Sequence, residues 1–229
     1  MSAGPASDEV AVVIPARNEA DRIQATVTAA AGLSAVALVV VVDDGSTDGT
    51  AAAAHQAGAA VMRHARNRGK GAAMETGAEA VRLLDQREHR GRPRHLLFLD
   101  ADLAGTAALA GPLIDPVLAG KTDMTIAVFA ATVKLGGHGL VVGLSGAGIR
   151  RATGWQPAQP LNGQRCLTRA AFEAARPLAR GWGVETGLTI DLLRKGWRVT
   201  EVEVELAHRA TGTGVEGAQR RLGEGALGP

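Results

Sequence analysis

The chain has 229 residues, of which 46% are hydrophobic and 21% are charged, a balance typical of a soluble globular protein with a full core. Its formal net charge of +2 is too small for a protein that coats nucleic acid. No stretch approaches the roughly 20 apolar residues that span a bilayer. The N-terminal residues lack the basic and apolar regions of a signal peptide. The single cysteine, Cys166, excludes an internal disulfide and fits a reducing compartment, so we expect a cytoplasmic protein.

Apolar runs with the length of strands alternate with amphipathic stretches along the first 130 residues. The expected strands are 10–14, 36–42, 59–62, 95–99 and 124–129. The expected helices are 23–31, one that starts near residue 50, one that starts at 69–71, and 106–118. Strands that alternate with helices at short spacing form βαβ units. The pattern therefore predicts an α/β domain with a mostly parallel sheet flanked by helices.

The second half of the chain is less regular. Gly136 to Gly139 predicts a hinge, and the amphipathic stretch 140–153 predicts either a lid over an adjoining site or a helix that lies on a membrane surface. The other expected elements are a loop over 155–163, helices over 168–178 and 185–195, and an edge strand over 197–206. Residues 1–9 and 211–229 are expected to be flexible tails.

Four polar loops follow expected parallel strands, at 15–19, 43–48, 66–71 and 100–102. In a doubly wound sheet the carboxyl ends of the strands share one edge, so these loops could enclose a single ligand. One loop is rich in carboxylates, one is basic with glycines, and one carries an acidic pair. A nucleoside diphosphate would use that mixture, because Asp44 can accept from a base or ribose while Arg17 and Lys70 meet phosphate charge.

The acidic pair, Asp100 and Asp102, directly follows the expected strand 95–99. A magnesium ion that is also held by substrate phosphates needs only one or two protein carboxylates, so the pair is a candidate metal site. The alternative is an ordinary strand-to-helix turn in which Asp102 or Thr106 caps the next helix.

The other loops also have structural explanations. The sequence Asp-Asp-Gly-Ser at 43–46 is a common turn, after which Thr47 or Asp48 caps a helix. The glycines around Lys70 lack the spacing of a P-loop. The basic run 87–94 has no interleaved aromatic residues, which predicts a solvated loop rather than a nucleic-acid patch.

Four motifs occur in series at specific spacings. They are Val13-Ile14-Pro15-Ala16-Arg17-Asn18-Glu19, Val42-Asp43-Asp44-Gly45-Ser46-Thr47-Asp48-Gly49-Thr50, Asn67-Arg68-Gly69-Lys70-Gly71-Ala72-Ala73 and Leu99-Asp100-Ala101-Asp102-Leu103. Together they resemble the family 2 glycosyltransferases with the GT-A fold, over roughly residues 10 to 130. The resemblance implies one GT-A-type, Rossmann-like domain. Its halves would be a nucleotide-sugar-binding part, 10–130, and an irregular acceptor- and sugar-binding part, 131–210.

The same resemblance implies roles for individual residues. The nucleotide would lie among Pro15, Ala16, Arg17, Glu19, Asp44, Asp100 and Ala101. Asp100-Ala101-Asp102 would be the Asp-x-Asp motif, in which Asp102 binds Mg²⁺ or Mn²⁺ and Asp100 contacts ribose or metal-bound water. Lys70 would lie near the diphosphate or the donor sugar. The metal would stabilise charge on the departing diphosphate as a Lewis acid.

Three segments of the second half are similar to the glucosyl-3-phosphoglycerate synthase branch and to polyprenyl-phosphate sugar transferases. They are Pro160 to Arg165, Gly181 to Leu188, and His208-Arg209. The similarity implies that Trp182 and Glu185 contact the sugar and acceptor, and that His208 completes the metal shell.

Glu185 is also explained as a first-turn charge at a helix N-terminus. It is the candidate base if the reaction inverts configuration, and it positions substrate if configuration is retained. Arg165 and Arg169 are candidates to meet an acceptor phosphate.

The predicted function is a metal-dependent glycosyltransferase that moves a hexose from a nucleotide-sugar, with UDP-glucose as the best guess, to a phosphorylated small molecule or a polyprenyl phosphate. One alternative is a nucleotidyltransferase, which would want a longer glycine-rich loop after the first strand. The other is a non-catalytic nucleotide-sugar-binding module, against which the four residues Asp100, Asp102, Glu185 and His208 argue. We expect no nucleic-acid partner. Peripheral contact with the inner face of the membrane and a homodimer are compatible with the sequence.

Overall fold

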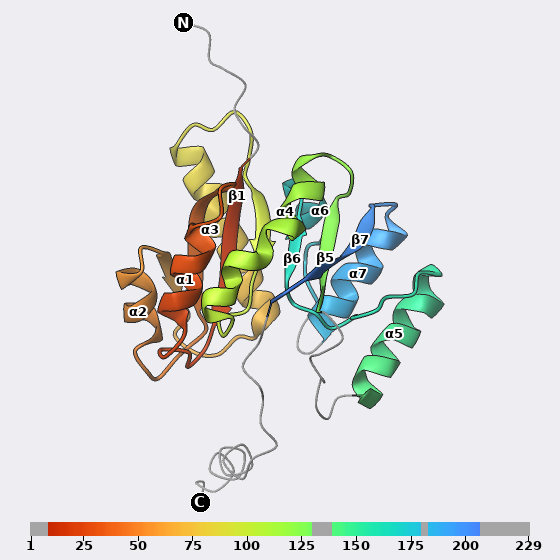
Figure 1. Cartoon of the computed structure of the whole chain (residues 1–229), viewed down its shortest axis with the longest axis horizontal. Helices are drawn as coiled ribbons and strands as arrows, with labels where there is room; N and C mark the ends of the chain where they lie inside the picture. Colours follow the sequence, from red (N-terminus) through yellow and green to blue (C-terminus); the bar gives the residue numbers. More distant parts are fainter. Residues whose placement is uncertain (1–8, 130–138, 180–182, 207–229) are drawn as a thin grey trace, which may run out of the picture.

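The structure is a computed structural model that describes residues 9–129, 139–179 and 183–206 (Figure 1). Within these residues a seven-stranded sheet has the strand order β3-β2-β1-β4-β6-β5-β7. The strands are β1 Val10–Ala16, β2 Val36–Asp43, β3 Ala60–Arg63, β4 His95–Phe98, β5 Met124–Phe129, β6 Arg165–Leu167 and β7 Val199–Val204. The helices are α1 Ile23–Ala31, α2 Thr50–Gln56, α3 Lys70–Arg87, the 3₁₀ helix η1 Ala104–Ala110, α4 Gly111–Leu118, α5 Gly139–Thr153, α6 Arg169–Ala175 and α7 Val184–Arg194.

Neighbouring strands of the sheet are parallel except around β6. This three-residue strand runs antiparallel to both β4 and β5, with Phe98 opposite Arg165 on one side and Ile126 opposite Arg165 on the other. The sheet ends at β7, which pairs with β5 alone in the order of the strands. The predicted α/β class, the mostly parallel sheet and the edge position of the last strand are therefore confirmed.

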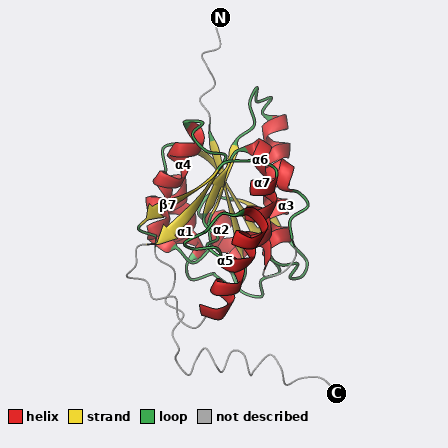
Figure 2. Ribbon diagram, turned by 90° about the vertical axis from the view of Figure 1, so that its right-hand side faces the viewer, coloured by secondary structure: helices red, strands yellow, loops and turns green. Residues whose placement is uncertain are grey.

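The sheet lies between two layers of helices (Figure 2). Val12 and Ile14 of β1 pack with residues of α1 and α4 in one core. Ala11 and Val13 point to the other face and pack with residues of α3, α6 and α7 in a second core. Because both faces are covered, strand β1 at the centre of the sheet is apolar along its whole length, as its sequence indicates.

Helix α3 lies very close to the sheet. A Cβ atom at Gly77 would lie 2.3 Å from Cγ1 of Val13 and 3.2 Å from Cγ2 of Val42, so only glycine allows this approach. The first turn of α3 therefore comes near the carboxyl ends of β1 and β2, at the lower edge of the sheet in Figure 1.

The structure differs from the predicted elements in a few places. The single helix expected over 106–118 is divided into η1 and α4, and prolines at 112 and 116 each lack an N–H for the helical hydrogen bonds. Strand β6 lies in a segment for which the sequence predicted no strand. The run 87–94 is mostly exposed, but Arg94 is buried against Asp85, which corrects the prediction of a wholly solvated loop.

The predicted boundaries at the two ends of the chain are only partly within the described residues. Glu9, assigned to the N-terminal tail, accepts a hydrogen bond at its carbonyl from the N–H of His95 and pairs with Arg90 at 2.6 Å. Most of the expected hinge 136–139 and the tail 211–229 lie outside the described residues. In the described part of the chain, no helix combines the length and the apolar character needed to cross a membrane.

Candidate active site

The four predicted loops meet at the carboxyl edge of the parallel strands and enclose one cavity of about 760 Å³. Residues of α5, α7 and the loop 160–163 complete its wall. The residues that line it include Pro15, Ala16, Arg17, Glu19, Asp44, Lys70, Asp100, Ala101, Asp102 and Glu185. The structure thus brings together all the predicted site residues of the first half, together with Glu185.

The loop after β1 is held against the loop after β2 by backbone and side-chain hydrogen bonds. The N–H of Asn18 donates to Ser46 Oγ at 3.0 Å, and Asn18 Oδ1 accepts from the N–H of Thr47 at 2.9 Å. Asp48 Oδ1 accepts from the N–H of Thr50 at 3.0 Å, but Gly49 is the N-cap of α2 and no side chain makes a cap hydrogen bond there, so the alternative in which Thr47 or Asp48 caps this helix is wrong. These bonds fix the cavity wall beside Asp44.

The Asp44 carboxylate is buried and accepts three hydrogen bonds. Oδ1 accepts from the N–H of Arg68 at 2.8 Å and contacts His64 Nδ1 at 2.7 Å, while Oδ2 accepts from the N–H of Gly69 at 2.8 Å. Burial by itself would raise the pKa of Asp44, but the bonds from His64 and from the two backbone N–H groups outweigh it and hold that pKa below its ordinary value. Asp44 is therefore a fixed, ionised acceptor at the cavity.

His64 is a residue of this region that the sequence reasoning missed. It directly follows β3, is buried, and also contacts Thr76 Oγ1 through Nε2 at 2.9 Å. Its position directly after a parallel strand could have pointed to His64, because the polar loops of the cavity were predicted from such positions.

Lys70, in the first turn of α3, joins the two acidic sides of the cavity. Its Nζ lies 2.7 Å from Asp100 Oδ1 and 2.9 Å from Glu185 Oε1. Burial alone would lower the pKa of Lys70, but the charges of Asp100 and Glu185 and their hydrogen bonds raise it above the ordinary value. Lys70 is thus a permanent positive charge between the two carboxylates.

The Lys70–Asp100 pair is confined by the loop that leads into β6. Gln164 Nε2 donates to Asp100 Oδ2 at 2.8 Å, and Gln164 is fully buried. A Cβ atom at Gly163 would lie 2.3 Å from Lys70 Nζ and 3.0 Å from Asp100 Oδ1. Position 163 therefore requires glycine as long as the lysine occupies this place.

Helix α1 and the residue that precedes it hold the Asp100–Ala104 turn in place through hydrogen bonds. Thr26 Oγ1 donates to the carbonyl of Ala101 at 2.8 Å and accepts from the N–H of Ala104 at 2.8 Å, and Arg22 donates to the carbonyl of Asp102 at 3.1 Å. The alternative in which Asp102 or Thr106 caps the following helix is wrong. No side chain caps η1, and the Thr106 hydroxyl donates to the carbonyl of Leu103 instead.

The donor set at this turn fits a hard divalent cation. Asp100 and Asp102 both line the cavity and offer only carboxylate oxygens, which suit Mg²⁺ or Mn²⁺ that substrate phosphates also hold. Among the described residues no three His, Cys, Asp or Glu side chains form a metal-binding group by themselves. His208, the predicted third ligand, lies outside the described residues, as does Trp182.

The predicted roles of Arg165 and Arg169 at an acceptor phosphate are wrong. Arg165 is fully buried, and its guanidinium group donates to the carbonyls of Pro160, Asn162 and Glu185 and to the Thr189 hydroxyl. Burial lowers the pKa of Arg165 to about 10, against the opposing charges of Glu185 and Glu201. Arg165 therefore fastens the loop 160–163 to the first turn of α7, which carries Glu185.

Arg169 is buried away from the cavity. It donates to the carbonyl of Ala78 at 3.0 Å and lies beside Asp85, near the C-terminal end of α3. Both arginines were misassigned for the same reason. Their guanidinium groups donate to carbonyls of other segments, and the residues near an arginine in the sequence do not reveal such partners.

The layered sheet, its strand order and the acidic cavity at its carboxyl edge define an α/β protein of the GT-A type, similar in fold to solved glycosyltransferases. The family model described as glycosyl transferase family 2 matches residues 11–139. The chain belongs to this family, as its four motifs predicted.

Two curated relatives match most of the chain. Glycosyltransferase AglJ of Haloferax volcanii is 30% identical over 213 residues, which cover 91% of this chain and 66% of the relative. Glucosyl-3-phosphoglycerate synthase of Mycolicibacterium paratuberculosis is 28% identical over 214 residues, which cover 83% of this chain and 62% of the relative. The chain thus spans about two thirds of the length of these relatives or less.

Solved structures of glucosyl-3-phosphoglycerate synthase from Mycobacterium tuberculosis share the fold. The complex with Mn²⁺, UDP and glucosyl-3-phosphoglycerate is 26% identical, with a TM-score of 0.71 over 95% of this chain and 76% of that one. The complex with Mg²⁺ and UDP is 26% identical, with a TM-score of 0.72 over 94% of this chain and 76% of that one.

Proposed function

We propose that this protein is a metal-dependent glycosyltransferase that moves a hexose from a nucleotide-sugar, UDP-glucose being the best-supported donor, to a phosphorylated acceptor. The observation that carries the proposal is the single cavity in which Asp44, Lys70, Asp100, Asp102 and Glu185 meet. Family membership supports it, and so do the relatives, whose structures were solved with UDP, UDP-glucose and Mn²⁺ or Mg²⁺.

The proposed donor site uses the first half of the chain, residues 10–130. Asp44 would accept from the base, with Pro15, Ala16, Arg17 and Glu19 around the nucleoside. The ammonium group of Lys70 would exchange part of its pairing with Asp100 and Glu185 for the charge of the diphosphate.

Asp100 and Asp102, with His208 as the third candidate, would hold the divalent cation. When bound, the cation supplies electrostatic stabilisation of the departing diphosphate. Glu185, in the first turn of α7, would contact the donor sugar. The anomeric configuration of the product decides whether Glu185 acts as a base, because inversion requires one and retention does not.

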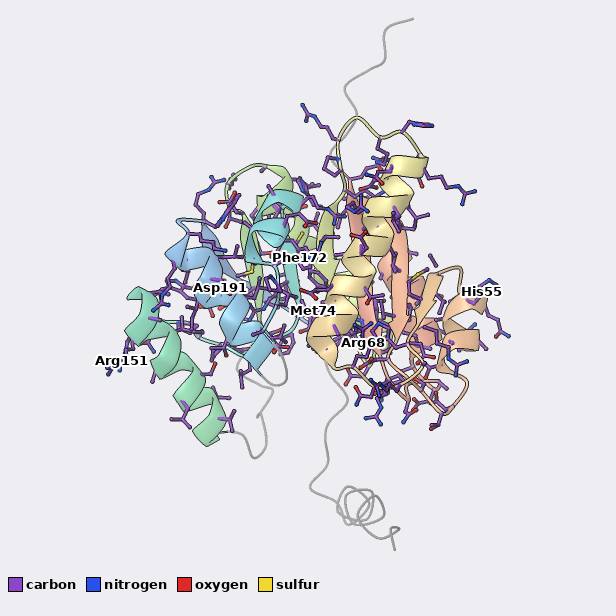
Figure 3. The ribbon with its side chains drawn as sticks, turned by 180° about the vertical axis from the view of Figure 1, so that it is seen from behind. His55, Arg68, Met74, Arg151, Phe172 and Asp191 are labelled. Atoms are coloured by element: carbon purple, nitrogen blue, oxygen red, sulfur yellow. The ribbon has the colours of Figure 1, made fainter. Side chains whose placement is uncertain are left out.

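Two kinds of acceptor share a phosphate group. Solved structures of the synthase hold phosphoglyceric acid or glycerol 3-phosphate, which supports a small phosphorylated acceptor. Helix α5 supports a lipid phosphate, because Val141 lines the cavity and is 51% exposed, while Leu144, one turn on, is 66% exposed. Arg150 and Arg151 are exposed at the other end of α5, and Arg151 points away from the rest of the molecule (Figure 3). This face would suit an anionic membrane surface.

The test is turnover of UDP-glucose with Mn²⁺ in the presence of 3-phosphoglycerate, glycerol 3-phosphate or a polyprenyl phosphate in detergent. We expect a glucosylated product with one of them, and none when Mn²⁺ is removed by a chelator. Sugar transfer that is unaffected by the chelator, or no transfer to any acceptor of these classes, would contradict the proposal. Peripheral location at the inner face of the membrane and a homodimer remain predictions.

Binding measurements test the metal site separately from turnover. We expect Asp102→Asn to abolish Mn²⁺-dependent UDP binding in calorimetry, because one of the cavity's few metal-type carboxylates is lost. His208→Ala should weaken Mn²⁺ affinity without unfolding the protein. Titration curves identical to those of the wild type would remove the substituted residue from the metal site.

A further inference from the structure

The acceptor capacity of the Asp44 carboxylate is nearly filled by the protein. A carboxylate offers about four lone-pair positions, two on each oxygen. His64 and the N–H of Arg68 occupy both positions on Oδ1, and the N–H of Gly69 occupies one on Oδ2. Among the described residues these are the only donors to the group, so one position on Oδ2 remains for a ligand in the cavity.

The role of His64 in this arrangement follows from its two partners. Asp44 is ionised and can only accept, so the Nδ1 atom of His64 carries the proton and donates. On the other side of the ring, Nε2 lies 2.9 Å from the Thr76 hydroxyl, which can donate or accept. Thr76 therefore holds the imidazole ring in the orientation that directs the Nδ1 proton at Asp44 Oδ1.

His64 acts from behind the cavity and not within it. It is 7% exposed and does not belong to the residues that line the cavity, whereas Asp44 does. Any effect of His64 on a ligand must therefore pass through the acceptor positions of Asp44. The two backbone N–H groups cannot be changed by substitution, which leaves His64 as the variable donor.

We propose that His64 is a positioning residue that determines base specificity: by saturating Oδ1 of Asp44, it leaves a single acceptor, which suits a uracil base and disfavours guanine. Uracil presents one ring N–H between two carbonyl oxygens. Guanine presents two neighbouring N–H groups, which need both oxygens of a carboxylate. The inference rests on the proposed function, in which Asp44 faces the base of the donor nucleotide.

The test compares UDP and GDP binding to the full-length protein by calorimetry with Mn²⁺. His64→Gln places its amide nitrogen near the position of Nε2 and removes the donor to Asp44, while His64→Asn keeps a donor near the position of Nδ1. We expect His64→Gln to lower the ratio of UDP to GDP affinity by about tenfold, the effect of one hydrogen bond. His64→Asn should retain most of the wild-type ratio. The matched control is His55→Gln, on the exposed outer side of α2 (Figure 3), which should leave the ratio unchanged.

Each outcome decides the inference. A wild-type ratio in a folded His64→Gln variant overturns it, and so does an equal fall in His64→Asn, because a packing defect would not distinguish the two amides. If His64→Gln fails to fold, Thr76→Val replaces it, and we expect a two- to threefold fall in the ratio because the imidazole ring is no longer held at Nε2; an unchanged ratio overturns the inference. If the wild type binds neither nucleotide, the proposed function is wrong, and this inference, which rests on it, is wrong as well.

Discussion

The two ends of helix α3 carry ion clusters of different construction. At its first turn Lys70 lies 2.7 Å from Asp100 and 2.9 Å from Glu185, and its side chain is 30% exposed to the cavity. Near its last turn Asp85 pairs with Arg94 at 2.7 Å and also accepts from the N–H of Arg94 at 3.0 Å, with both side chains buried. The first cluster opens on the candidate active-site cavity. The Asp85–Arg94 pair of the second, which we call the closed cluster, is buried, although Asp85 also borders a separate pocket.

The two clusters have different cations, a lysine beside the cavity and an arginine in the closed cluster. The lysine suits a site whose ion pairs can exchange, and the arginine suits one that stabilises the fold. A lysine ammonium is a compact charge on a flexible stem, so it can move from a carboxylate to a phosphate. An arginine presents a planar set of donors whose geometry is lost if one partner leaves. We therefore expect substitutions at the open cluster to affect activity, and substitutions at the closed cluster to affect stability.

The largest expected effect is at the closed cluster. Asp85→Ala leaves Arg94 and Arg169 buried without this carboxylate, and we expect the free energy of unfolding to fall by about 3–5 kcal/mol. Urea denaturation measures it, with Glu79→Ala as control, since the exposed Glu79–Arg82 pair should contribute no more than about 1 kcal/mol. Equal losses in the two variants would remove the distinction between buried and exposed pairs here.

The open cluster should respond in activity instead. Lys70→Met removes the charge that we assign to the diphosphate, and we expect kcat to fall by roughly 10²–10³-fold. The melting temperature should change little, because the pair is partly exposed. Lys121→Met is the control for loss of a positive charge, because Lys121 is exposed and does not line the cavity. A variant with wild-type kcat would show that Lys70 serves only to hold the two carboxylates.

A smaller effect is expected from crowding the lysine rather than removing it. Gly163→Ala places a methyl group where Lys70 Nζ now lies, so the ammonium must shift. We expect kcat to fall by up to about 10²-fold, the cost of a displacement near 1 Å, with UDP affinity retained. Gly105→Ala is the matched control, because a Cβ atom there meets nothing within 4 Å. A parallel loss of UDP affinity would indicate a general collapse of the cavity.

The smallest effect concerns acid stability at Asp44. Its pKa is lower in the folded protein than in the unfolded chain, so its contribution is complete above the ordinary aspartate pKa of about 3.9 and is lost as pH falls through the lower folded value. The stability difference between wild type and Asp44→Asn should therefore be constant from pH 5 to pH 7 and should shrink below about pH 4. A difference that grows on acidification would contradict the lowered pKa.

Most of the sheet could be predicted because its strands are locally distinctive. Strands β1, β2 and β5 are apolar runs of six to eight residues, and β5 has the predicted bounds. The polar cavity residues of the first half could also be predicted, since they follow parallel strands, whereas Pro15, Ala16 and Ala101 were assigned only through the family resemblance.

The features that escaped prediction depend on contacts between distant segments. Strand β6 has three residues and includes Arg165, whose buried charge is satisfied by carbonyls of the loop 160–163 and of α7. Thr26 supports the Asp-x-Asp turn from 75 positions away in the sequence. Neither the short strand nor the long-range hydrogen bond produces a periodicity or a composition that can be recognised in a single sequence.

The position of β6 between β4 and β5 determines where the chain can be cut into fragments. Strands β4 and β5 belong to the first half of the chain, yet each pairs with β6 of the second half, and they are not neighbours in the sheet. A fragment that stops at residue 130 would lack the bridge between them, and because β7 is lost as well it would expose one edge of β4 and both edges of β5. The two halves of the chain, 10–130 and 131–210, are therefore not independent folding units, and a chimaera with a relative must carry β6 together with its two neighbours.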